Sequence, residues 1–512
     1  MMRILKRMKG WLGRKLQVIC ALATLATAAE ATWSIVVVDT ATGEVCVATA
    51  TCLAGLNIAN YVPVIVVGEG AAAAQNYVDQ SGQNRILIRD ALLAGLDPSV
   101  ILSNLAASDA QHNSRQYGIV SLNGGPPIAY TGNGGGGAKK QVYGEVGTLR
   151  YSIQGNVLAG QVVVDAAEAA LLETEGDLVT RAMASMQAAR FMGGDGRCSC
   201  STLIPTSCGA PPPSFVHSAY TACIIVARDG DVDGTCASSG CANGSYYLRK
   251  TITGNAGLPD PVETLGRQVM QWRISKRGRP DHIQTEVLPS ATRLPADGLS
   301  TSEVTIRLKD IDGVQLTDGG QTFILDDITP GGPIVSLTNQ VDHGDGTHTL
   351  SFTSGTTPGT ARIKISVAHW WEESQLYPYL ELNLDAPSQL HLGNEVLSAV
   401  DGGEAPLTLD FGAQGAGRPY FLLVSGAGTQ PGTPFSGLTL PLNSDRLLDW
   451  SLGAPNPGFW PSMNGDLDAN GRRLSTLNVA PGALAPFVGS RLDFCALLPG
   501  YVTAPVGFDV SP

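Results

Sequence analysis

The spacing of apolar residues changes near residue 280, and this change divides the chain into two kinds of structure. Before it, short apolar runs alternate with stretches of helical periodicity, which favours a layered α/β domain over residues 32–277. After it, strand patterns stand alone: Val304, Ile306 and Leu308 alternate with polar residues, as in a half-buried antiparallel sheet. With 512 residues, 43% of them hydrophobic, and 61 glycines, the chain is long enough for about three domains rich in turns.

Strands and helices are expected to alternate through the first part. The expected strands, apolar along most of their length as in a sheet covered by helices, are 34–39, 44–51, 61–67, 116–122, 127–131, 149–154 and 219–227. The expected helices are 85–107, interrupted near Asp97-Pro98, then 161–173, 177–191 and 261–272.

The β part divides into two expected modules. Residues 283–385 predict a sandwich of about 100 residues, with turn clusters such as Asp310–Gly313 between its strands. Residues 390–512 are again strand patterns, glycine and proline, and predict a second small β-sandwich. The expected fold is therefore an α/β domain followed by two all-β sandwich modules.

The first 31 residues have the composition of a secretory signal peptide. Six basic residues precede a mostly apolar run at 16–26, and Ala29-Glu30-Ala31 is a small-x-small cleavage site. A membrane anchor is the alternative, but the apolar run is shorter than the roughly 20 residues that span a bilayer. Val18-Ile19 before Cys20 is too bulky for a lipoprotein site. We expect cleavage after Ala31, no membrane span afterwards, and a secreted or periplasmic protein.

Charge argues against one class of partner. Removing residues 1–31 takes away six positive charges and Glu30, so the net charge moves from −12 to about −17. A protein this acidic is not expected to bind nucleic acid through its phosphates.

The cysteines that remain after Cys20 are clustered. Six of these nine fall within 44 residues: Cys198, Cys200, Cys208, Cys223, Cys236 and Cys241. In an oxidising compartment this density favours disulfides that clamp a long insertion. Zinc is the alternative, but the repeated C-x2-C spacing is missing. Cys46 and Cys52 are expected to be buried as small hydrophobic residues, and the odd total leaves at least one thiol without a partner in the chain.

Cleavage after Ala31 would make Thr32 the first residue of the mature protein. A free α-amino group, with a pKa of about 7.7–8.0, would then lie beside the hydroxyl that it must deprotonate. Nucleophile and base would come from one residue, and the strand that follows would hold Thr32 rigidly with Ser34 on the same face. The alternative is an N-terminal Thr with no chemical role.

Five motifs occur in order from Thr32 onward: TWSIVVVDTATGEVCVATAT, AAAAQNYVDQSG, RQYGIVSLNGGPPIAYTGNG, YSIQGNVLAG and FMGGDGR. Together they resemble the family catalogued as domain of unknown function 1028, which is grouped with the N-terminal-nucleophile (Ntn) hydrolases. The resemblance covers residues 32–277 and implies a four-layer αββα fold with Thr32 at the nucleophile position. The other family-like polar positions are Ser34, Gln75, Arg115, Gln116, Gln154, Asn156, Asp195 and Arg197.

The resemblance suggests roles for these positions. Besides Thr32 and Ser34, the predicted catalytic groups are Asn156 and the Gly155 amide, as donors to a developing oxyanion. The predicted substrate-binding residues are Gln75, Arg115, Gln154, Asp195 and Arg197, of which the last two would hold a substrate carboxylate or amine. Alternatively, Asn156 is a turn residue and Asp195 belongs to a loop that ends a helix.

Two segments of the β part, LPADGLSTSEVTIRLKDIDGVQL and GDGTHTLSFTSGTTPGTARIKISV, resemble bacterial invasin/intimin-type immunoglobulin-like domains. This resemblance implies a spacer or an adhesive module rather than a catalyst.

Other motifs predict turns. Gly132–Gly137 fits G-x-G-x-x-G but lacks a following helix pattern, so a surface turn near the site is expected rather than a dinucleotide site. The segments that begin at Asp229 and Asp466 start like calcium loops but lack the Glu at position twelve, so hairpin turns are expected. We expect no metal site and no cofactor.

These observations support three hypotheses. The first is an exported Ntn-type amidohydrolase that cleaves an amide in a peptide, a cell-wall fragment or a small metabolite through Thr32. The second is a non-catalytic extracellular binding or adhesive protein that retains the fold, since no Lys follows Thr32 until Lys139 and proteasome-like electrostatics are not carried over. The third is a subunit of a homo-oligomer.

Overall fold

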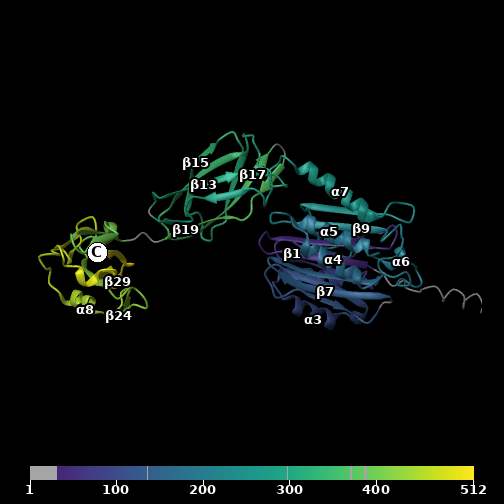
Figure 1. Cartoon of the computed structure of the whole chain (residues 1–512), viewed down its shortest axis with the longest axis horizontal. Coiled ribbons are helices and arrows are strands. Elements are labelled where there is room, and N and C mark those ends of the chain that lie inside the picture. The colour runs from purple at the N-terminus through teal and green to yellow at the C-terminus, as the bar shows by residue number, and fades with distance from the viewer. Residues whose placement is uncertain (1–31, 135–136, 297, 370–371, 386–388) are drawn as a thin grey trace, which may run out of the picture.

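The computed structural model of the chain describes residues 32–134, 137–296, 298–369, 372–385 and 389–512. The expected signal peptide, residues 1–31, lies outside these ranges. Figure 1 shows a first region of sheets and helices in purple to teal, then green strands, then a β-rich body that ends in yellow.

The first region is built on a six-stranded antiparallel sheet with the order β10-β9-β2-β1-β8-β7. Its strands are β1 (Thr32–Asp39), β2 (Glu44–Thr51), β7 (Ala138–Val146), β8 (Leu149–Leu158), β9 (Thr221–Ala227) and β10 (Leu248–Thr253). Strand β1 lies inside this sheet, and its residues from Thr32 to Val38 are buried on both faces. The apolar run that predicted this strand is therefore explained by its central position.

A second sheet, with the order β3-β4-β5-β6, stacks on the first. Its strands are β3 (Pro63–Val66), β4 (Gly70–Asn76), β5 (Arg115–Ser121) and β6 (Ile128–Thr131). Val36 and Val38 share one core with Ile65 and Ala71 between the sheets. The even-numbered side chains of β1 thus face the second sheet.

Helices cover the outer face of each sheet. Trp33, Ile35 and Val37 point the other way, into a core shared with α4 (Val162–Glu173), α5 (Leu178–Phe191) and α7 (Pro261–Lys276). The helices on the second sheet are α2 (Gln83–Leu93) and α3 (Pro98–Ser108). The expected interruption at Asp97-Pro98 separates these two helices, since Pro98 is the first residue of α3.

Three strands of this region have no counterpart in the sequence-based expectation: β4, β7 and β10. Strand β4 reads GAAAAQN and lacks the β-branched residues that favour a strand. Its alanines are buried against the first sheet and the helices. Small side chains allow the two layers to approach closely, and this tertiary requirement outweighs the weak strand propensity.

The next region is all β, as expected. One sheet has the order β11-β13-β16-β15 and the other β12-β19-β17-β14, with β18 beside β17. The strands are β11 (Glu286–Pro289), β12 (Arg293–Pro295), β13 (Thr301–Arg307), β14 (Thr322–Asp327), β15 (Val335–Asp342), β16 (Thr347–Ser354), β17 (Gly359–His369), β18 (Glu372–Gln375) and β19 (Leu380–Asp385). The alternating Val304, Ile306 and Leu308 form its core with residues of the second sheet.

The last region is also mostly β. Its sheets have the orders β20-β22-β27, β21-β30-β28-β23-β26 with β29 beside β28, and β24-β25. The strands are β20 (Leu390–Leu392), β21 (Val396–Ser398), β22 (Gly403–Asp410), β23 (Pro419–Ser425), β24 (Thr433–Phe435), β25 (Leu438–Leu440), β26 (Asn464–Asp466), β27 (Arg472–Val479), β28 (Arg491–Leu498), β29 (Tyr501–Val502) and β30 (Val506–Ser511). One helix, α8 (Arg446–Gly453), was not expected; Asp445 caps it by accepting a hydrogen bond from Leu448 N at 2.8 Å.

The disulfides correct part of the cysteine prediction. The pairs are Cys52–Cys198, Cys200–Cys208 and Cys236–Cys241. Cys52 forms a disulfide rather than being buried as a small hydrophobic residue. The Cys52–Cys198 disulfide therefore connects the cysteine-rich segment to the end of β2. Among the described residues the unpaired thiols are Cys46, Cys223 and Cys495, all buried.

Candidate functional site

Thr32 lies at the edge of the inter-sheet space. It opens β1, pairs in register with Thr51 on β2 and Asn156 on β8, and is 2% exposed. Ser34 lies two residues further along the same face and is fully buried. The predicted nucleophile therefore lies at a buried, polar end of the space between the two sheets.

Gln116 on β5 connects the candidate residues. Its Oε1 accepts hydrogen bonds from Gln75 Nε2 at 2.7 Å and from Asn156 Nδ2 at 2.9 Å. Its Nε2 donates to Gly155 O at 3.0 Å and to Thr131 Oγ1 at 2.8 Å. All the hydrogen-bonding capacity of this amide is used, so Gln116 fixes its neighbours in place.

Gln75 and Ser34 complete the support for Thr32. Gln75 Nε2 donates to Thr32 O at 3.0 Å. Ser34 Oγ hydrogen-bonds Gln75 Oε1 and lies 2.8 Å from Thr49 Oγ1, which in turn donates to Trp33 O at 2.9 Å. Ser34 therefore fixes the Gln75 side chain, which in turn binds the backbone carbonyl of Thr32.

Gln154 is part of the same cluster but is less completely satisfied. Its Oε1 accepts a hydrogen bond from Ser152 Oγ at 2.9 Å, while its Nε2 is buried without a partner. A Cβ on Gly118 would lie 2.3 Å from Gln154 Oε1. Glycine at this position therefore leaves room for the Gln154 side chain.

Strand β8 is irregular at Asn156. Its pairing with β7 shifts between Ala138 and Lys140, so that β8 carries one extra residue. Val157 has a φ of +51°, which is strained for a β-branched residue. Bulges of this kind often redirect a side chain beside a functional site. The oxyanion role predicted for Asn156 and Gly155 remains a prediction.

Arg115 lies next to Gln116 but is engaged elsewhere. Its Nε donates to Asp109 Oδ2 at 2.7 Å, and its guanidinium lies 5.4 Å from the centre of the Tyr77 ring. Nη1 is buried without a partner. The structure therefore separates Arg115 from the hydrogen-bonded cluster around Thr32.

The Asp109–Arg115 pair gives a testable pH dependence. Burial alone would raise the pKa of Asp109, but hydrogen bonds from Arg115 and Asn84 outweigh it and hold the pKa at about 2. A carboxyl with a lowered folded pKa stabilises the fold above its unfolded pKa, and loses that contribution as the pH falls through the folded value. We expect Asp109→Asn to lower the free energy of unfolding at neutral pH by about 2 kcal/mol. Between about pH 4 and pH 2, the free energy of unfolding of Asp109→Asn, measured with denaturant, should also change less with pH than that of the wild type. Equal slopes in the variant and the wild type would contradict this.

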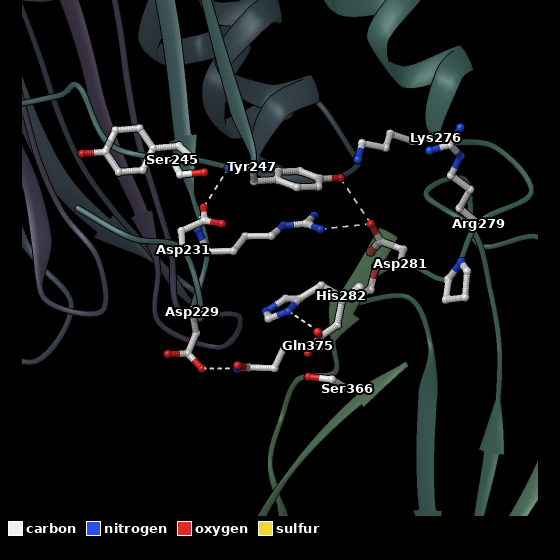
Figure 2. A pocket seen from close by; sticks show the side chains of 16 residues that line it. Asp229, Asp231, Ser245, Tyr247, Lys276, Arg279, Asp281, His282, Ser366 and Gln375 are labelled. Atoms are coloured by element: carbon white, nitrogen blue, oxygen red, sulfur yellow. Dashed lines mark hydrogen bonds and ion pairs between the residues drawn. The ribbon is translucent and has the colours of Figure 1, made fainter. Parts of the chain in front are cut away.

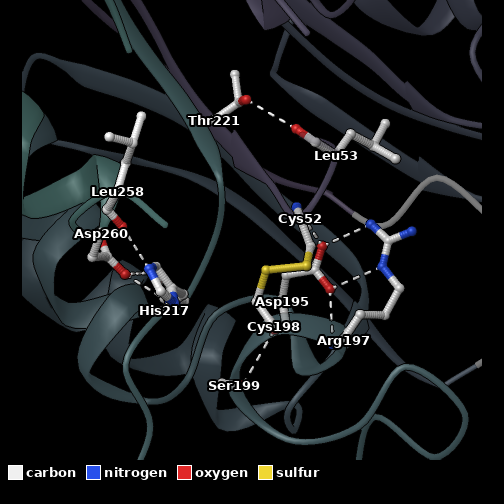
Figure 3. The surroundings of a disulfide bond; sticks show 11 residues. Cys52, Leu53, Asp195, Arg197, Cys198, Ser199, His217, Thr221, Leu258 and Asp260 are labelled. Carbon is white, nitrogen blue, oxygen red and sulfur yellow. Dashed lines mark hydrogen bonds and ion pairs between the residues drawn. A yellow bond between two sulfur atoms is a disulfide. The ribbon is translucent and has the colours of Figure 1, made fainter. Parts of the chain in front are cut away.

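Asp195 and Arg197 bind each other beside the first disulfide, as Figure 3 shows. Asp195 is fully buried and caps the short helix α6 (Gly196–Ser199) by accepting from Arg197 N at 3.0 Å. The same carboxylate accepts from Arg197 Nη2 at 2.8 Å and from Cys52 N at 2.8 Å. Cys52 directly follows Thr51, the cross-strand neighbour of Thr32. The carboxylate thus ties α6 to the strand end beside Thr32, and its predicted contact with substrate remains untested.

A second polar cluster, absent from the sequence-based expectation, lies where the first region meets the next (Figure 2). It lines a cavity of about 490 Å³. Arg228, 3% exposed, donates to Glu44 Oε1 at 2.7 Å and to Asp281 Oδ2 at 3.0 Å, and its guanidinium lies 3.4 Å from the centre of the Tyr247 ring. The only signal in the sequence is an arginine at the end of an apolar strand.

Contacts across this junction use residues of both regions. Asp229 accepts a hydrogen bond from Gln375 Nε2 at 2.5 Å and another from Tyr379. His282 Nδ1 donates to Gln375 O; burial lowers the pKa of His282 to about 4, so the ring is neutral near pH 7. The first region and the β region that follows it are therefore joined by specific polar contacts.

The acidic residues of the calcium-like segments make hydrogen bonds within the protein. Asp229 and Asp231 accept hydrogen bonds from protein groups. Asp468 accepts from Asn470 N and Arg472 N, each at 2.8 Å, as in a tight hairpin turn. Within the part of the chain that the structure describes, no group of His, Cys, Asp and Glu is arranged to hold a metal ion.

Two family models match the chain. Residues 32–208 match the one described as a family of unknown function (DUF1028), and residues 281–374 match the one described as invasin, domain 3. The chain thus carries a DUF1028 region followed by an invasin-like domain, an order consistent with an extracellular adhesive or binding role. No curated protein matches the chain.

Solved structures show similarity to both parts. A DUF1028 protein of Silicibacter pomeroyi is 18% identical, over 47% of this chain and 88% of that chain, with a TM-score of 0.34. The Yersinia pseudotuberculosis adhesin InvE is 17% identical, over 44% of this chain and 58% of that chain, with a TM-score of 0.19. Invasin, a bacterial integrin-binding protein, is 11% identical, over 94% of this chain and 60% of that chain, with a TM-score of 0.19.

Together with the three disulfides, the invasin-domain match indicates an extracellular or cell-surface protein. In the described ranges, none of the helices combines the length and the apolar character that a bilayer crossing requires.

Proposed function

We propose that the DUF1028 region is an exported Ntn-type amidohydrolase whose nucleophile is Thr32. The observation that carries this proposal is the position of Thr32 at the start of a central strand, where Gln75 holds its carbonyl oxygen and Gln116 holds its neighbour Asn156. Two stacked sheets, each with helices on its outer face, support an Ntn-type αββα arrangement.

The proposed reaction uses Thr32, the substrate amide and water. The Thr32 hydroxyl attacks the amide carbonyl carbon while the α-amine takes the hydroxyl proton. The protonated amine gives this proton to the leaving nitrogen, and the C–N bond breaks to leave an acyl ester on Thr32. Water, deprotonated by the same amine, hydrolyses the ester to a carboxylic acid and restores the hydroxyl. The proposed substrates are amides in peptides, cell-wall fragments or small metabolites.

Replacement of Thr32 tests this reaction. In exported protein, Thr32→Ala should lower the hydrolysis of any amide substrate by a factor of at least about 1,000, because the variant lacks the attacking oxygen and cannot form the acyl-ester intermediate. Thr32→Ser keeps a hydroxyl and should retain measurable turnover. An electrophilic β-lactone should add its mass to the N-terminal peptide of the wild type but not to that of Thr32→Ala. Wild-type hydrolysis by Thr32→Ala would rule out the proposed nucleophile.

A second candidate function is binding without turnover, with the chain acting as an extracellular adhesive protein. The match of residues 281–374 to invasin domain 3 favours it. Saturable binding of amides or peptidoglycan fragments, without hydrolysis and without covalent trapping of Thr32, would support this function.

Light scattering of the exported protein would test whether the chain forms a homo-oligomer.

A further inference from the structure

The backbone of β1 points the nitrogen of Thr32 toward Asn156. Thr40 N donates to Thr148 O at 2.9 Å, at the far end of the β1–β8 pair. In an antiparallel pair, hydrogen-bonded and non-hydrogen-bonded residue pairs alternate. The even-numbered residues of β1 therefore direct their N–H groups toward β8, and Thr32 faces Asn156 in register.

The side-chain amide of Asn156 has a fixed orientation. Gln116 Nε2 donates to the Gly155 carbonyl, which can only accept, so Oε1 must be the atom of Gln116 that faces Asn156. Asn156 must then present Nδ2 to Gln116, because the reverse orientation would oppose two oxygen atoms. This leaves Asn156 Oδ1, on a side chain that is 1% exposed, buried without a hydrogen-bond partner.

Cleavage at Ala31–Thr32 would supply the missing donor. In the uncut chain the Thr32 nitrogen carries one hydrogen, which the backbone ladder uses. Hydrolysis adds water across the peptide bond, leaves a carboxylate on Ala31, and gives Thr32 an amine with two hydrogens or an ammonium with three. The new N–H groups need further acceptors, and an unsatisfied buried acceptor is costly. Asn156 Oδ1 belongs to the residue that already faces this nitrogen.

We propose that Asn156 is the positioning residue for the α-amine of Thr32, with Oδ1 as the acceptor for one of the new N–H groups. The inference rests on the proposed cleavage before Thr32. It concerns Oδ1 and is separate from the oxyanion role expected for Asn156, which would use the Nδ2 hydrogen that Gln116 does not engage. Asn156 thus orients the amine that serves as the base, and Gln116 acts through Asn156.

The test measures the pKa of the α-amine itself. Exported, cleaved protein is acetylated with limiting acetic anhydride across a pH series, and the modified N-terminal peptide is quantified by mass spectrometry. Asn156→Asp places a negative charge beside the ammonium and should raise the amine pKa by about 1 unit. Asn156→Leu removes the acceptor and should lower the pKa by about half a unit. Circular dichroism checks that each variant is folded; should the leucine variant not fold, the aspartate variant alone decides.

Ser152→Ala is the matched control. Ser152 is buried on the same face of β8, but it pairs with Val36 rather than Thr32 and hydrogen-bonds Gln154. The Thr32 α-amine of the Ser152→Ala variant should have the same pKa as in the wild type. If the α-amine pKa in both Asn156 variants also equals the wild-type value, the inference is overturned.

The inference and the proposed function can fail separately. Shifted pKa values without any amide hydrolysis would refute the hydrolase but support the role of Asn156. Thr32-dependent hydrolysis with unchanged α-amine pKa values would support the hydrolase but refute the role of Asn156. A mature chain that starts at another residue would overturn both.

Discussion

An Arg228→Leu variant is expected to lose about 3–5 kcal/mol of unfolding free energy. Arg228 is the cation between two buried carboxylates, Glu44 at 2.7 Å and Asp281 at 3.0 Å. Leucine keeps apolar volume at this position, but it leaves both carboxylates buried without a counter-charge and removes the stacking on Tyr247. Denaturant unfolding of the full chain at neutral pH measures the loss.

The pH dependence of this loss identifies its cause. Burial raises the pKa of Glu44 even though Arg228 opposes the rise. Without Arg228 the pKa should rise further, and a carboxyl whose folded pKa lies above its unfolded pKa loses its contribution to stability as the pH rises. The deficit of Arg228→Leu should therefore shrink as the pH is lowered and Glu44 takes up a proton.

Arg277→Leu is the matched control for this experiment. Arg277 pairs with Asp312 at 2.6 Å, but its side chain is 57% exposed. Exposed ion pairs contribute little, so we expect a change below about 1 kcal/mol. Equal losses for Arg228→Leu and Arg277→Leu would contradict the assignment of Arg228 as a buried ionic centre.

Removing the bridge between Cys52 and Cys198 is expected to have the second large effect. The two cysteines are 146 residues apart in the chain, and in the chain-entropy account a bridge over such a loop contributes about 5 kcal/mol. The Cys52→Ala/Cys198→Ala double variant should lose stability of that order. Because Cys52 follows the cross-strand neighbour of Thr32, and its N–H binds Asp195, Thr32-dependent hydrolysis should fall as well.

The Cys200→Ala/Cys208→Ala double variant is the control. This bridge lies in the same segment but spans a sequence separation of only 8, for which the same account gives about 2.5 kcal/mol. In denaturant unfolding under oxidising conditions, the loss of unfolding free energy should therefore be about twofold larger for the Cys52/Cys198 variant than for the Cys200/Cys208 variant. A larger loss for the shorter loop would contradict the account of the Cys52–Cys198 bridge as the link that ties α6 to β2.

Local patterns were sufficient for the elements whose packing agrees with their propensity. The continuous apolar run of β1 and the alternation of Val304, Ile306 and Leu308 predicted buried and half-buried strands. Strand β4 could not be found in this way, because its run of alanines is explained only by the close approach of neighbouring layers.

The site is less accessible to sequence reasoning than the fold. The position of Thr32 and the family-like residues marked the cluster, but not the orientation of the Gln116 amide, which depends on the Gly155 carbonyl on another sheet. Arg228 and Glu44 lie 184 residues apart in the chain, so no spacing rule brings them together. Such contacts depend on the packing of whole layers.

The most direct test of the central claim is the mass of the N-terminal peptide of the exported protein. We predict that the mature chain begins at Thr32 with a free α-amine, because the proposed base exists only after the Ala31–Thr32 bond is cut. A first residue other than Thr32, or a blocked amine on Thr32, would contradict the proposed hydrolase.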